Sequence, residues 1–127
     1  MRGAVVAEVG RPPEVREVGE PEPGEGEALI DVLAAPLNPL DISVGSGRFY
    51  GGHPDPPYVP GSEAVGRVRA SERFEVGTLA WAHGGGFGQR RDGGLAERAV
   101  VPDSALTPLP DCDAVLAGAL GVAGLAG

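Results

Sequence analysis

The residue types that could do chemistry are few and widely spaced along this chain. The only imidazoles and the only thiol are His53, His83 and Cys112, and about thirty residues separate each from the next. Catalytic zinc needs three nitrogen, sulfur or oxygen ligands that converge on one point. The spacing neither supports nor excludes such a site. We expect two loop histidines, an inert thiol and no bound metal.

Glu63 is a more promising carboxylate. It follows Pro60-Gly61-Ser62 and opens a segment that is otherwise small and apolar, so we expect it near the wall of a β-structure. A carboxylate in such surroundings needs a hydrogen-bond partner or a shifted pKa. We therefore assign Glu63 to a site or to its scaffold.

The segment Asn38-Pro39-Leu40-Asp41 has the pattern of a helix start. Asn38 suits the N-cap, Pro39 suits the first helical position, and Asp41 lies near the positive end of the helix dipole. Gly45 and Gly47 should end this helix after about two turns.

Most of the remaining chain alternates between apolar and polar residues, which is typical of half-buried strands. Pro-rich and Gly-rich loops separate these segments, and together they predict a mainly β, partly closed barrel. A second helix is expected at the C-terminal end, with Asp111 or Asp113 as its cap. The expected strands are residues 1–9, 15–18, 27–35, 63–69, 76–82 and 95–101, and the expected second helix is residues 111–127.

Composition excludes several classes of function. The 127 residues carry a formal net charge of −8, which disfavours nucleic acid and anionic membranes as partners. The longest uncharged run, residues 114–127, is too short to span a bilayer. The chain has no Gly-x-Gly-x-x-Gly turn, and residues 84–88 come closest. One cysteine permits no internal disulfide and fits a reducing compartment, so we expect a cytoplasmic protein.

A series of motifs in a fixed order resembles a known family. The motifs are Asn38 to Asp41, Ser46 to Tyr50, Pro57 to Gly66, Gly93 to Pro102, and Leu109-Pro110. Together they resemble the N-terminal half of the medium-chain dehydrogenase/reductase superfamily. The resemblance covers nearly the whole chain and is closest to the zinc-free quinone oxidoreductase branch.

This resemblance implies a GroES-like, partly open β-barrel with a short helix and a C-terminal linking helix. Residues 1–112 would form the substrate and catalytic domain. Residues 113–127 would begin the linker toward a Rossmann domain that is absent from this chain. In the family that domain binds NADPH and forms the homodimer.

The resemblance also implies a reaction and a site. Zinc-binding relatives have Cys at the Asn38 position and His at the Ser62 position, so their zinc ligands are missing here. The implied reaction is hydride transfer from NADPH to a quinone or an α,β-unsaturated carbonyl. Asn38 would bind the nicotinamide or the substrate carbonyl. Candidate catalytic residues are Asn38, Tyr50 and Glu63, and the cleft would be lined by Asn38, Asp41, Ser43, Phe49, Ser62 and Glu63.

Two alternatives remain at this stage. Enoyl reductase modules of polyketide assembly lines share the zinc-free pattern. A lone GroES-like barrel could instead be a non-enzymatic binding module, because the cofactor-binding half is not in this chain.

Overall fold

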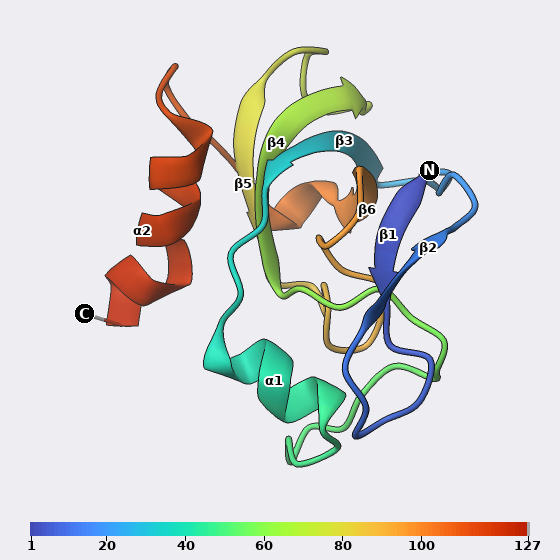
Figure 1. Ribbon diagram of the computed structural model, residues 1–127. Coiled ribbons are helices and arrows are strands. Elements are labelled where there is room, and N and C mark those ends of the chain that lie inside the picture. The colour runs from blue at the N-terminus through green and yellow to red at the C-terminus, as the bar shows by residue number, and fades with distance from the viewer. Residues whose placement is uncertain (127) are drawn as a thin grey trace.

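The computed structural model describes residues 1–126 and is mainly β (Figure 1). Its elements follow one another along the chain as β1 (Arg2–Val5), β2 (Glu14–Glu17), β3 (Glu27–Ala34), α1 (Pro39–Gly45), β4 (Glu63–Ala70), β5 (Leu79–His83), β6 (Arg98–Pro102), the 3₁₀ helix η1 (Asp103–Ala105), β7 (Leu106–Pro108) and α2 (Ala114–Ala126).

Five strands form one antiparallel sheet in the order β6-β3-β4-β5-β7, and β1 and β2 form a hairpin. The hairpin joins the sheet through residues just before β6, because the Ala4 N–H donates to the Leu95 carbonyl at 2.8 Å. The Glu97 N–H donates in return to the Arg2 carbonyl at 3.1 Å. The sheet curves around a core, and the expected partly open barrel is confirmed (Figure 1).

The main core lies inside this curved sheet. It consists of small and branched apolar side chains together with Phe87, which enters from the loop after β5 and is fully buried. A second, smaller cluster lies under α1, where Val6, Val44 and Tyr58 pack together with Leu40 and Phe49. The smaller cluster holds α1 through Leu40 and Val44, close to the candidate site.

Helix α2 packs on the outside of the sheet, beside β4 and β5 (Figure 1). Asp113 caps it, since its Oδ1 accepts the N–H groups of Val115 at 2.9 Å and Leu116 at 3.3 Å. Asp111 does not cap the helix and instead lies 3.7 Å from Arg67. The helix therefore begins later than residue 111, where the sequence pattern places its start. The expected end at Gly127 lies outside the described residues.

Several expected strand limits were wrong, for identifiable reasons. The strand expected over residues 1–9 ends at Val5, because Val6 pairs with Tyr58 instead. Residues 76–78 form a turn before β5, with Gly77 at φ +92. The sequence also gave no indication of β7, an edge strand that ends in Pro108. Proline is tolerated there because an edge strand needs fewer ladder hydrogen bonds.

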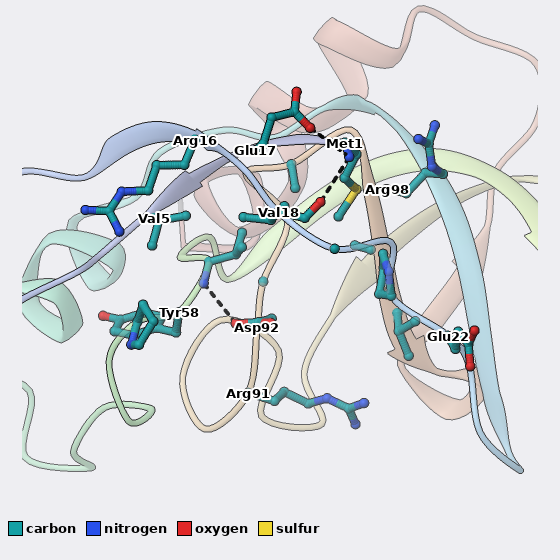
Figure 2. Close-up of a pocket in the computed structure, with 18 of the residues that line it drawn as sticks. Met1, Val5, Arg16, Glu17, Val18, Glu22, Tyr58, Arg91, Asp92 and Arg98 are labelled. Atoms are coloured by element: carbon teal, nitrogen blue, oxygen red, sulfur yellow. Dashed lines mark hydrogen bonds and ion pairs between the residues drawn. The ribbon is translucent and has the colours of Figure 1, made fainter.

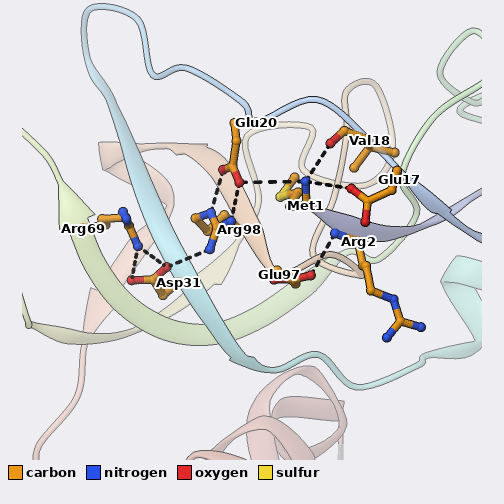
Figure 3. Close-up of polar contacts among 9 residues, drawn as sticks. All are labelled: Met1, Arg2, Glu17, Val18, Glu20, Asp31, Arg69, Glu97 and Arg98. Atoms are coloured by element: carbon orange, nitrogen blue, oxygen red, sulfur yellow. Dashed lines mark hydrogen bonds and ion pairs between the residues drawn. The ribbon is translucent and has the colours of Figure 1, made fainter.

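Ion pairs tie residues 20–26, the acidic connector before β3, to the barrel (Figure 3). Arg98 on β6 forms an ion pair with Glu20 and lies 3.8 Å from Asp31 on β3, while Arg69 on β4 lies 3.1 Å from the same Asp31. The hydrogen bond from Arg98 holds the pKa of Glu20 below its usual range. The contacts are largely exposed, so each contributes little stability alone.

We expect acid to remove a further ion pair, the one between Arg91 and Glu27. Arg91 pairs with Glu27, and the Gly24 N–H donates to the other carboxylate oxygen at 2.9 Å. Both interactions, the Arg91 hydrogen bond first, hold the pKa of Glu27 below its ordinary value of 4.5. A lowered folded-state pKa stabilises the protein above the ordinary value, and this stability is lost as pH falls through the folded-state pKa.

Glu27→Gln should therefore lower the urea midpoint at neutral pH, and the difference from wild type should shrink toward about pH 3. Glu25→Gln, which changes an exposed carboxylate of the same connector, is the control and should show little difference at any pH. A Glu27→Gln deficit of constant size across the pH range would contradict this account.

Candidate functional site

Four polar residues that the sequence singled out meet where α1 and β4 begin. Asn38, Asp41, Ser62 and Glu63 are all buried, with exposed fractions of 8%, 5%, 1% and 0%. They come from two segments more than twenty residues apart in sequence. Buried polar groups at one place need mutual hydrogen bonds, and the structure supplies them.

Asp41 holds the start of α1 and connects it to β4. Its Oδ2 accepts the Asn38 N–H at 2.8 Å, and its Oδ1 accepts the Ser62 N–H at 2.7 Å. Asn38 is the N-cap and Pro39 opens the helix, as the sequence predicts. The carboxylate therefore fixes the position of Asn38 relative to β4.

Glu63 has the partners that a buried carboxylate requires. The Asn38 side-chain Nδ2 donates to Glu63 Oε2 at 2.6 Å, and the Trp81 indole Nε1 donates to Glu63 Oε1 at 2.9 Å. An ionised carboxylate only accepts hydrogen bonds, so the Asn38 amide must turn its NH₂ group toward it. The orientation of the Asn38 amide is thereby set by its neighbour.

Two buried hydroxyl groups have no hydrogen-bond partner among the described residues: Ser62 Oγ in this cluster and Tyr58 Oη beside it. Burial raises the pKa of the Tyr58 phenol, and the negative charge of Asp41 raises it further. Tyr58 therefore stays protonated at neutral pH. Buried hydroxyls without partners are uncommon and mark places where a water or ligand group can bind.

The other residues expected in the cleft lie elsewhere. The Ser43 carbonyl accepts the N–H groups of Arg48 at 3.0 Å and Phe49 at 3.1 Å, which closes the end of α1. Phe49 packs against the small cluster under α1. Tyr50 is 97% exposed and contacts the Phe49 ring, with centroids 4.8 Å apart. The structure does not bring Tyr50 to Glu63.

Two concave surfaces flank this region. A mainly apolar groove of about 330 Å³ runs along α1, and Leu37, Asp41 and Ile42 line it. A larger pocket of about 510 Å³ lies between the β1–β2 hairpin and the loop that carries Arg91 and Asp92 (Figure 2). The arginines that line the larger pocket include Arg91 and Arg98, both already in ion pairs. The groove is the one that adjoins the buried polar cluster.

Sequence reasoning missed Trp81. A buried indole N–H needs a hydrogen-bond acceptor. Trp81 lies on the strand that pairs with the strand of Glu63, and this need could have pointed to Trp81 as a partner of the carboxylate. No group of three or more His, Cys, Asp or Glu residues within residues 1–126 is arranged to hold a metal ion. Over the same residues, no helix has both the length and the apolar character to cross a membrane.

Comparison with known proteins gives a family match. Residues 24–111 match the family described as the alcohol dehydrogenase GroES-like domain. This range includes β3 through β7, and with them all four residues of the buried polar cluster.

Curated relatives and solved structures extend the match. An alcohol dehydrogenase of Rhizobium meliloti is 36% identical over 65% of this chain and 26% of its own length. A probable acrylyl-CoA reductase of Escherichia coli is 35% identical over 87% of this chain and 35% of its own length. The structure of the Thermus thermophilus quinone oxidoreductase, known also in complex with NADPH, superposes with a TM-score of 0.78 at 35% identity and covers 96% of this chain and 37% of its own. The chain thus spans about a third of the length of such relatives or less.

Proposed function

The chain belongs to the alcohol dehydrogenase GroES-like domain family, and from this premise we propose that it is the substrate domain of an NADPH-dependent, zinc-free oxidoreductase. The proposed reaction transfers hydride to a quinone or an α,β-unsaturated carbonyl. The observation that carries the proposal is the buried cluster at Asn38, in which Asp41 and Glu63 fix an amide at the start of α1. The likeness to a quinone oxidoreductase structure supports the choice of substrate class.

The residues present fit the nicotinamide end of such a cofactor. The cofactor supplies the hydride when it is bound. Asn38 retains part of its surface, and its amide has a second N–H and an acceptor oxygen besides the N–H that it donates to Glu63. It can therefore orient a carboxamide or a substrate carbonyl. The rest of the dinucleotide would bind a following Rossmann domain, which would also form the homodimer, and the boundary at residue 112 remains a prediction.

The donor set also supports the zinc-free part of the proposal. At the two positions where zinc-binding relatives carry Cys and His, this chain has the amide of Asn38 and the hydroxyl of Ser62. Both groups are weak zinc ligands. Both oxygens of Asp41 accept backbone N–H groups, and both oxygens of Glu63 accept side-chain donors. These carboxylates would have to give up hydrogen bonds to bind a metal.

A second substrate class has its own support. The probable acrylyl-CoA reductase matches 87% of this chain, which favours an enoyl thioester as an alternative acceptor. Hydride transfer to the β-carbon of an enoyl thioester is the same chemistry as reduction of an enone. The two substrate classes differ in the size of the group that the cleft must admit.

The test is an assay of the complete polypeptide that carries these residues, with NADPH and three acceptors: p-benzoquinone, a simple enone and an enoyl thioester. We expect NADPH oxidation with at least one acceptor, and a kcat about 10-fold to 100-fold lower for Asn38→Ala. Ser104→Ala, at the exposed residue of the 3₁₀ helix η1, is the control and should leave kcat unchanged. Inactivity toward all three acceptors would count against the proposed reaction.

A further inference from the structure

We propose that Trp81 is a positioning residue of the candidate site, because its indole N–H holds Glu63 and Glu63 in turn holds the Asn38 amide. The role of the site in catalysis rests on the proposed function. The hydrogen-bonded connection from Trp81 to Asn38 is independent of that function and can be tested separately.

Among the described contacts of Glu63 are two donors, one on each carboxylate oxygen. Trp81 Nε1 lies 2.9 Å from Oε1, and Asn38 Nδ2 lies 2.6 Å from Oε2. Two donors on opposite oxygens fix the plane of the carboxylate. If the indole N–H is removed, Glu63 Oε1 loses this donor, and the hydrogen bond from Asn38 to the same carboxylate is held less firmly in direction.

Trp81 is itself held firmly. In the antiparallel pairing of β4 with β5, Trp81 lies opposite Val65 and His83 lies opposite Glu63, so the indole reaches diagonally toward the carboxylate. The His83 ring stacks on the indole, with centroids 5.1 Å apart and planes within 1° of parallel. Aromatic stacking of this kind restricts the indole to one orientation.

Helix α2 covers the pair from the outside. At Gly121 the backbone leaves helical geometry, with φ −50 and ψ −108. A Cβ at this position would overlap Glu63 Oε1 and lie 2.8 Å from Trp81 Nε1. Only glycine allows the helix to approach so closely. Hydrogen bonds shielded from water in this way are stronger than exposed ones.

The consequence for the site is a pre-oriented amide. Asn38 is fixed through its backbone by Asp41 and through its side chain by Glu63. Little free energy is then lost in ordering the Asn38 amide when a ligand binds to it. Residues that orient a binding group in advance raise the precision of a site in this way. Trp81 would act on the ligand only through Glu63 and Asn38.

The chain is well suited to a spectroscopic test, because it contains one asparagine and one tryptophan. Asn38 therefore gives the only asparagine side-chain NH₂ signal in a ¹⁵N-labelled sample of the 127-residue chain. In Trp81→Phe, which keeps a ring but removes the N–H, the hydrogen exchange of the Asn38 NH₂ should quicken about tenfold. Phe74→Leu, an aromatic change in the segment between β4 and β5, should leave that exchange rate unchanged. If folded Trp81→Phe exchanges the Asn38 NH₂ hydrogens at the wild-type rate, the proposal is overturned.

A second variant covers the case in which Trp81→Phe does not fold. Gly121→Ala retains both donors but pushes a methyl group against the carboxylate and the indole. The indole N–H signal of Trp81 and the NH₂ signal of Asn38 should then shift together. If the indole signal moves and the Asn38 signal does not, the connection through Glu63 is refuted.

The complete polypeptide separates this inference from the proposed function. We expect Trp81→Phe to lower kcat about tenfold there, with little change in the KM for NADPH. Coupled NMR signals in an inactive wild-type protein would refute the proposed function and leave the positioning role intact. An active wild-type protein whose Asn38 signal ignores Trp81 would refute the positioning role alone.

Discussion

Glu63→Ala should lower the free energy of unfolding by about 4 kcal/mol, because it removes the shared acceptor of two donors and leaves a cavity. The Asn38 amide and the Trp81 indole would lose their partners where Glu63 is fully buried. Urea denaturation, followed by far-UV circular dichroism, measures this difference.

Glu63→Gln is the matched control. It keeps the shape of the side chain and an acceptor oxygen for the indole, and it removes the charge. We expect it to cost less than about half as much as Glu63→Ala. A Glu63→Ala variant within about 1 kcal/mol of wild type would contradict the account of the cluster.

Gly88→Ala should destabilise the protein by about 3 kcal/mol or more, for a reason of backbone packing. Gly88 lies in the loop after β5 with φ +72. A Cβ there would overlap the Gly61 carbonyl oxygen and lie 2.8 Å from the Ser62 nitrogen. Both neighbours are backbone atoms directly before Glu63, so the substitution would also displace the start of β4.

Two other glycines separate the cost of a positive φ from the cost of the overlap with the Gly61 backbone. Gly52 also has a positive φ, of +85, but has open space around its Cβ position, so Gly52→Ala should cost only about 1 kcal/mol. Gly19 has open space and no positive φ, so Gly19→Ala should be nearly neutral. Equal costs for Gly88→Ala and Gly52→Ala in urea denaturation would show that the contact with Gly61 does not matter.

The sequence was sufficient to predict the start of α1, because N-cap chemistry is local. Asn38, Pro39 and Asp41 occupy positions that their side chains favour without help from the rest of the fold. Glu63 could be predicted as part of a site because a carboxylate stood out in an apolar segment. Its bond to Asn38 was consistent with the family resemblance, and the structure shows the contact directly.

The partner of Glu63 on β5 depends on strand register. A shift of one residue would move Trp81 to the other face of the sheet, and local sequence does not fix register to that accuracy. The contact with Gly121 depends in addition on how α2 packs against β4 and β5. Tyr50 illustrates the converse, since its place in a motif suggested a role in the site and the structure leaves it 97% exposed.

The most direct test of the central claim uses the complete polypeptide and NADPH that carries deuterium at the transferred position. If the Asn38 cluster faces a nicotinamide, deuterium should appear on the β-carbon of the reduced enone or enoyl thioester, and Asn38→Ala should slow its transfer about 10-fold to 100-fold. For a quinone, whose product exchanges the label with water, the rate of NADPH oxidation replaces the label as the readout. Deuterium transfer that proceeds equally fast in Asn38→Ala, or no transfer to any of these acceptors, would contradict the account.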